Sequence, residues 1–111
     1  MRILLLNPPA ANGVLVVREG RCMQRAGAWT AVWAPVTLAT TAALLLAEGH
    51  EVLLRDCIVE GLDSEDVRAL VRAYRPQLVV LNTGTPSIDS DLRLADEIKA
   101  SGVGATTLAL G

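Results

Sequence analysis

Polar and glycine residues directly follow four apolar runs of this chain. Asn7 and Pro8 follow the first run, the turn 56–61 the second, the segment NTGTPS (82–87) the third, and Gly111 the fourth. Amide, carboxylate and hydroxyl groups can hold the polar edge of a ligand, and glycine lets a backbone approach it closely. These residues form a binding site if the fold brings the ends of the four runs together.

The elements that must position these residues are strands and helices in alternation. The apolar runs are RILLL (2–6), EVLLR (51–55), QLVVL (77–81) and TTLAL (106–110). They are apolar on both faces, which is typical of buried parallel strands. Helical patterns run from Pro35 to Gly49, from Asp63 or Ser64 to Tyr74, and from Ile88 to about Gly102. The second places Val67, Leu70, Val71 and Tyr74 on one stripe, and the third places Ile88, Leu92, Ala95 and Ile98 on another.

This order predicts one α/β domain over residues 1–111. Its parallel sheet has four strands, right-handed crossovers and helices on both faces. In such sheets ligands bind at the carboxyl ends of the strands, beside the point where the strand order reverses. The polar residues after the four runs should therefore converge on one rim. His50, the one histidine, precedes the second strand and should lie at the opposite rim.

Composition and motifs exclude several classes of protein. The net charge of −2 argues against a nucleic-acid surface, and no apolar run approaches the roughly 18 residues of a membrane span. The N-terminus lacks a signal-peptide pattern, so we expect a cytoplasmic protein with free Cys22 and Cys57 thiols. The glycine motif of dinucleotide folds, the P-loop lysine and the acids of a receiver domain are all absent.

A set of segments, taken in order, resembles the cobalamin-binding domain that precedes radical-SAM domains. The segments are ILLLNPP (3–9), WAPVTLATTAALLLAEGHEVLLRDC (33–57), PQLVVLNTGTPSIDSDLRLADEIK (76–99) and ATTLALG (105–111). The resemblance implies a flavodoxin-like sheet, bound cobalamin, and methyl transfer or related radical chemistry in the parent enzyme. The implied binding residues are Asn7, Pro8, Asp56, Ile58, Gly61, Asn82, Thr83, Gly84, Thr85 and Gly111.

The turn from Asp56 to Gly61 has the spacing of the Asp-x-His-x-x-Gly motif of other cobalamin domains, with Ile58 in the histidine place. An aliphatic side chain has no lone pair and cannot ligate cobalt. The resemblance therefore implies cobalamin with its benzimidazole tail off the metal and with no protein imidazole in its place. The alternative is structural, with Asp56 satisfying N–H groups at the start of a helix.

The resemblance also implies that the chain is the N-terminal part of a longer enzyme. A Gly-Gly pair commonly ends the fourth strand of cobalamin domains, and this sequence stops at Gly111. S-adenosylmethionine and a 4Fe-4S cluster would belong to a radical-SAM domain downstream. We expect no turnover from the fragment alone. The bare apolar edge of its fourth strand is prone to pair with another copy.

The long segment 10–34 concentrates the unusual residues of the chain. It holds Trp29, Trp33, Cys22 and Met23, and its arginines Arg18, Arg21 and Arg25 recur at roughly helical spacing. Loops of this length are usually functional or disordered. The arginines can bind carboxylate or phosphate groups of a ligand, and the tryptophans can cover a corrin, meet another domain or fold back on the sheet.

Two other functions fit the same residues. In the first, NTGTPS holds a nucleotide or another phosphorylated ligand through its N–H groups and hydroxyls. The same segment also fits an ordinary strand–helix turn built on Gly84 and Pro86. In the second, the chain is a partner-binding domain with a vestigial corrin site, acting through the segment 10–34.

Overall fold

The computed structural model describes residues 1–10, 16–18, 24–25 and 34–111. Its main sheet contains four parallel strands, β1 (Arg2–Asn7), β4 (Glu51–Asp56), β5 (Leu78–Asn82) and β6 (Thr106–Leu110). Their order across the sheet is β4-β1-β5-β6, so the chain first moves from β1 to one side and then crosses to the other. This is a flavodoxin-like α/β fold, and its strand order reverses between β1 and β5.

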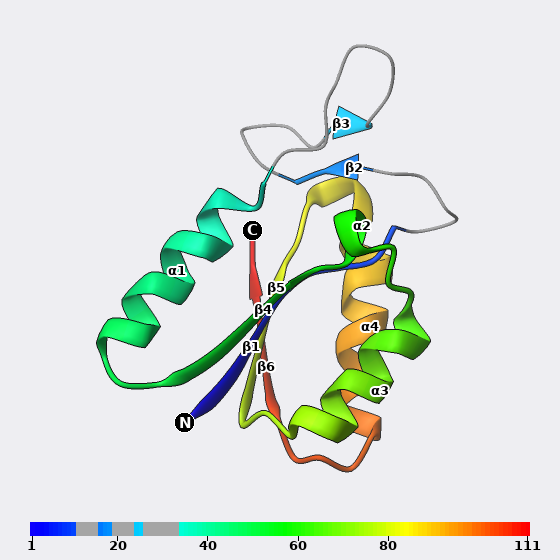
Figure 1. The fold of residues 1–111 in the computed structure, drawn as a ribbon. Coiled ribbons are helices and arrows are strands. Elements are labelled where there is room, and N and C mark those ends of the chain that lie inside the picture. The colour runs from blue at the N-terminus through cyan, green and yellow to red at the C-terminus, as the bar shows by residue number, and fades with distance from the viewer. Residues whose placement is uncertain (11–15, 19–23, 26–33) are drawn as a thin grey trace.

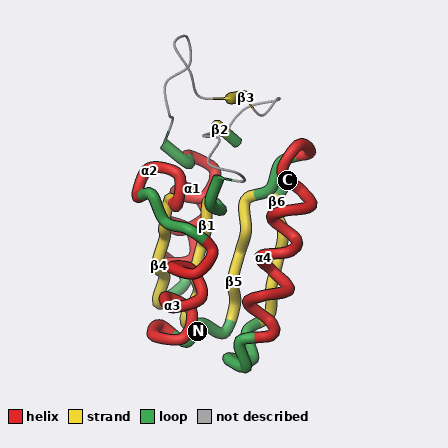
Figure 2. Tube along the Cα trace, turned by 90° about the vertical axis from the view of Figure 1, so that its right-hand side faces the viewer, coloured by secondary structure: helices red, strands yellow, loops and turns green. Residues whose placement is uncertain are grey.

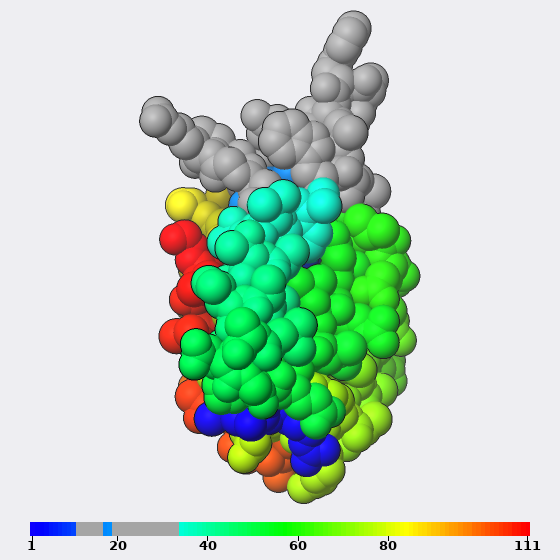
Figure 3. Space-filling view, turned by 60° about the vertical axis from the view of Figure 1, so that its left-hand side comes forward, coloured from blue at the N-terminus to red at the C-terminus, as the bar shows by residue number. Residues whose placement is uncertain are grey.

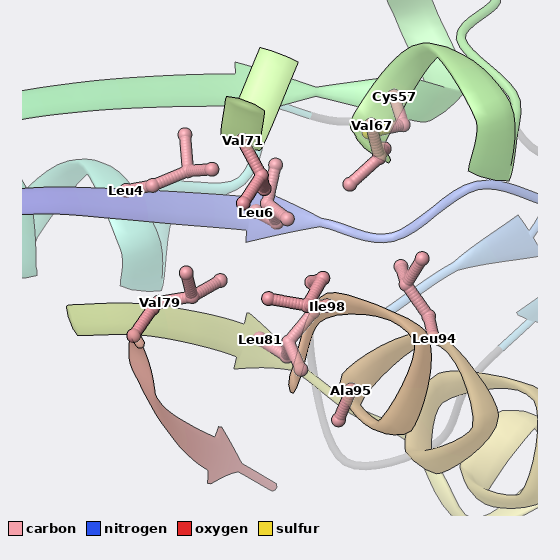
Figure 4. Packing of buried hydrophobic residues seen from close by; sticks show 11 residues of the cluster. Leu4, Leu6, Cys57, Val67, Val71, Val79, Leu81, Leu94, Ala95 and Ile98 are labelled. Atoms are coloured by element: carbon pink, nitrogen blue, oxygen red, sulfur yellow. The ribbon is translucent and has the colours of Figure 1, made fainter. Parts of the chain in front are cut away.

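Helices cover both faces of this sheet (Figure 1). One face carries α1 (Val36–Ala47), and the other carries α3 (Ser64–Tyr74) and α4 (Ile88–Ala100). Successive residues of β1 serve the two faces in turn, since Leu4 and Leu6 pack toward α3 and α4 whereas Ile3 and Leu5 pack toward α1. Figure 4 shows the larger of the two clusters, with the leucines of β1 between side chains of α3 and α4. Because both faces are buried, β1 reads as a continuous apolar run.

Helix boundaries follow the local signals of the sequence. Pro35 is the N-cap of α1, and Gly49, just beyond the helix, has a positive φ of 88°. Asp63 is the N-cap of α3, where its carboxylate accepts from Asp66 N at 2.8 Å and Asp66 reciprocates. Such a reciprocal box satisfies two N–H groups that the helix itself leaves free.

The predicted apolar stripe of α3 is confirmed, and that of α4 is partly wrong. In α4 the buried residues are Asp91, Leu94, Ala95 and Ile98. Leu92 is instead 47% exposed, and Ile88 is only partly buried. The buried face of α4 is rotated because Asp91 turns inward toward a charged partner, as described below.

Four short elements were not predicted. They are β2 (Val16–Val17), β3 (Gln24–Arg25), α2 (Cys57–Glu60) and the 3-10 turn η2 (Thr85–Ser87). β2 and β3 pair antiparallel and form a second small sheet. Among the helices of the described residues, none is long and apolar enough to cross a membrane.

Candidate functional site

The structure brings the four strand ends to one rim (Figure 2). Asn7 of β1 is paired in register with Asp56 of β4, and Asn82 of β5 with Leu110 of β6. The chain's one histidine lies at the opposite rim, where its Nδ1 is 3.4 Å from the amino nitrogen of Met1. The fold therefore gathers the polar strand ends as the sequence predicts and keeps the imidazole away from them.

Asp56 organises the β4 end of this rim. Its Oδ1 accepts hydrogen bonds from Asn7 Nδ2 at 2.8 Å and from the backbone N–H groups of Ile58 and Val59 at 3.2 and 3.4 Å. The side chain of Glu60 in turn accepts a hydrogen bond from the backbone N–H of Asp56 at 3.0 Å. Asp56 thus caps α2 and fixes the end of β1, which is the structural alternative considered for this turn.

The turn continues with two buried side chains and one exposed glycine. Cys57 and Ile58 both belong to the buried residues of α2. Burial raises the pKa of the Cys57 thiol to about 12, and the charges of Glu60 and Asp56 act in the same direction. Gly61 ends α2 with φ 66°, a left-handed conformation that glycine adopts without strain.

The β5 end supplies the least committed polar groups. Asn82 is 7% exposed and faces the α1 side of the sheet, and no described residue is hydrogen-bonded to its side-chain amide. Thr83 binds β6 twice, since its N–H and its hydroxyl both donate to the carbonyl of Leu110 at 2.7 and 2.8 Å. A Cβ on Gly111 would lie 3.0 Å from Thr83 Oγ1, so glycine permits this close approach. Thr85 is exposed and Gly84 is half-buried.

Arg18 enters the rim between β1 and the β5–α4 connection, where the strand order reverses. Its guanidinium donates to Pro8 O at 2.8 Å, to Asn7 Oδ1 at 3.3 Å and to Ser87 Oγ at 3.4 Å. It also pairs with Asp91, with Nη2 3.1 Å from Oδ1 and both side chains 1% exposed. The Ser87 hydroxyl completes the cluster by donating to Asp91 Oδ2 at 2.6 Å. The guanidinium of Arg18 thus fills part of the crevice between β1 and the β5–α4 connection.

Burial and charge act against each other in this cluster. Burial lowers the pKa of Arg18, and the charge of Asp91 opposes that change. Burial likewise raises the pKa of Asp91, while the Ser87 hydrogen bond and the Arg18 charge oppose it. The sequence analysis assigned the loop arginines to carboxylate or phosphate groups of a ligand, whereas Arg18 is paired with Asp91 of the chain itself. A signal existed, since Asp91 shares helical spacing with Leu94, Ala95 and Ile98 on the buried face.

A hollow of about 480 Å³ lies beside this cluster, on the side of the sheet covered by α3 and α4. Its walls include Pro8, Pro9, Asp63, Asp89, Arg93 and Glu97. Of the predicted binding residues only Pro8 lines it, so the hollow and the open part of the rim near Asn82 are separate features. In the described part of the chain, no three His, Cys, Asp or Glu residues are grouped as metal ligands.

Several predictions for the segment 10–34 concern residues outside those the structure describes, namely Trp29, Trp33, Cys22, Met23 and Arg21. Comparison with family models, with curated proteins and with solved structures finds no match for the chain. Fold and rim together define a flavodoxin-like α/β domain that gathers polar strand ends at its carboxyl rim.

Proposed function

We propose that the chain is a cobalamin-binding module of a radical-SAM enzyme. The observation that carries this proposal is the arrangement of the rim: strands ordered β4-β1-β5-β6 present Asn7, Asp56, Asn82 and Gly111 at one edge. That edge is where open parallel sheets bind ligands. The segment resemblance described above supplies the identity of the ligand.

The residues present fit a large ligand with a polar tail on the β5–β6 side of the rim. Asn82 is 7% exposed, and its side-chain amide has donors and an acceptor to offer. Beside it, Gly111 lies close to Thr83 Oγ1, and Gly84 is half-buried. Asn7 and Asp56 are hydrogen-bonded to each other, which fixes the β1–β4 part of the rim where the resemblance places them as binding residues. When bound, cobalamin supplies methyl-group chemistry at cobalt, and the residues of this chain only bind and orient it.

The cofactor would be held with its benzimidazole tail off the metal and without a protein imidazole. The one histidine lies at the other end of the sheet, bonded at its Nδ1 to the amino terminus. Ile58 is buried below the Asp56 cap and offers no lone pair. S-adenosylmethionine, the iron–sulfur cluster and the reaction itself would belong to a second domain of the parent protein.

A visible-spectrum titration with hydroxocobalamin and methylcobalamin tests the proposal. We expect the base-off spectrum on binding, and a roughly tenfold weaker affinity in Asn82→Ala because a buried hydrogen bond is lost. His50→Ala is the matched control and should bind with the same affinity and spectrum. An unchanged spectrum at millimolar protein, or a spectrum that depends on His50, contradicts the proposal.

Melting experiments with phosphorylated ligands and with cobalamins test the alternative function, a phosphate-binding module. Phosphorylated ligands that raise the melting temperature while cobalamins do not would select that function. The structure disfavours it, because Asp89 lies in the first turn of α4 beside NTGTPS, and the nearby cation Arg18 is already paired with Asp91.

A further inference from the structure

Helix α1 is uncharged and mostly apolar, although only one of its faces is covered. No charged residue occurs from position 34 to 47, and Leu38 is the one buried residue of the helix. Val36, Leu44 and Leu46 are 62%, 65% and 55% exposed. A helix that is hydrophobic all round is normally buried all round. The outer side of α1 is therefore an unsatisfied contact surface.

Beside α1, the described residues cover the same face of the sheet only in part, because Val80 of β5 is 2% exposed but the neighbouring strand β6 has no helix over it. α1 lies over β4 and β1, and Leu108 of β6 is paired in register with Val80, a member of the α1-side cluster. Leu108 is 48% exposed, and Figure 3 shows β6 (red) uncovered beside α1. We call this strip the open lane, formed by Leu78, Thr106, Leu108 and Leu110. Two strands span about 10 Å, which is the width of one helix.

We propose that this face forms a symmetrical dimer in which α1 of each copy lies in the open lane of the other. The two-fold axis is parallel to the strands, and the α1 faces of the two sheets lie toward each other. This axis places the β4–β1 half of one sheet opposite the β5–β6 half of the other. Each α1 is then enclosed between its own β4–β1 half and the β5–β6 half of the second copy. The contact is isologous, as in most homodimers, and a two-fold contact of this kind is closed.

A second copy fits this surface better than a charged partner does. The helix is about 18 Å long and the lane about 17 Å, and neither carries a charged residue. The two contacts would bury the exposed Val36, Leu44, Leu46 and Leu108 of each copy, which is a small interface of the kind that forms weak, reversible dimers. Side chains here are small or aliphatic, mainly alanine, threonine, valine and leucine, which suits close packing of a helix between two sheets.

Sedimentation velocity of the whole chain between about 1 and 500 µM tests this inference, which does not rest on the proposed function. We expect a reversible dimer whose dissociation constant rises about 100-fold or more in Leu44→Lys and in Leu108→Lys, because each would bury an unpaired charge. Leu92→Lys is the matched control, since Leu92 is 47% exposed on α4 at the other face, and it should dimerise as the wild type does.

Two outcomes would overturn the inference. One is a monomeric wild type over the whole concentration range. The other is a dimer that Leu44→Lys does not weaken, which is the behaviour of pairing through the edge of β6. Circular dichroism shows whether each variant keeps the fold, and Leu44→Gln gives a neutral second variant that should weaken the dimer to a lesser degree.

Discussion

Arg18 and Asp91 are joined in a buried ion pair, 3.1 Å from Nη2 to Oδ1, although 73 positions separate them in the chain. The pair ties the described residues 16–18 to the first turn of α4 and closes part of the crevice between β1 and β5. Pro8, Asn7 and Ser87 accept the remaining hydrogen bonds of the guanidinium. Burying two charges is costly, and this cluster offsets the cost by satisfying nearly every donor and acceptor.

Removing one partner of this pair should destabilise the fold strongly. We expect Arg18→Ala to lower the free energy of unfolding by about 3–5 kcal/mol, since Asp91 would keep an uncompensated buried charge. The matched control is Arg68→Ala in the half-exposed pair Arg68–Glu97, whose cost should stay below about 1 kcal/mol. Urea denaturation measures both, and equal costs would refute the distinction.

Lowering the pH should raise the free energy of unfolding of the wild type relative to that of Asp91→Asn. Burial raises the pKa of Asp91, so the folded state takes up this proton at higher pH than the unfolded state does. The contribution of Asp91 to stability therefore grows as the pH falls from about 7 to about 4. Urea denaturation of both proteins across this range checks the sign. A wild-type advantage that shrinks in acid would mean that Arg18 and Ser87 outweigh burial and lower this pKa.

The thiol of Cys57 should be inert in the folded protein. Its pKa of about 12 leaves roughly 10³-fold less thiolate near pH 8 than an ordinary cysteine has, and the thiolate is the reactive form. We expect slow labelling by a disulfide reagent in Cys22→Ser, the variant that removes the other cysteine, and fast labelling once urea unfolds it. Fast labelling without denaturant would contradict the burial of Cys57.

The reciprocal cap of α3 should contribute a small, separable increment. Asp63→Ala removes the acceptor for Asp66 N, and it should lower the free energy of unfolding by about 1 kcal/mol. Asp63→Ser retains an acceptor oxygen and should cost about half as much or less. Thermal and urea denaturation measure the series, and an alanine variant as stable as the serine variant would show that the cap adds nothing.

Local patterns predicted most of the regular elements. The apolar runs became β1, β4, β5 and β6 with shifts of one residue, because strands buried on both faces need apolar side chains at every position. Pro35, Asp63 and the glycines at 49 and 102 marked helix ends through φ preferences and capping, which depend only on neighbouring residues. Convergence of the strand ends on one rim then followed from parallel order alone.

The long-range polar partners could not be predicted in this way. Arg18 was one of three arginines at roughly helical spacing in a long segment. The spacing of Asp91 indicated that it could be buried, but nothing local indicated that Arg18 would be its partner. Leu92 was assigned to the buried stripe of α4 because it is apolar, yet it is exposed while Asp91 is buried. The free amide of Asn82 and the bare strip beside α1 also depend on which elements become neighbours.

The sequence by itself determined the alternation of strands and helices, their approximate ends and the rim at which polar residues gather. The periodicity of hydrophobic residues and the backbone preferences of proline, glycine and capping residues act over a few positions, so they can be read from the sequence. Only the tertiary structure decided which side chains fill the crevice, which remain free to bind, and which apolar face lacks a cover. Those outcomes depend on burial and charge pairing between residues far apart in the sequence, and these exist only once the sheet has formed.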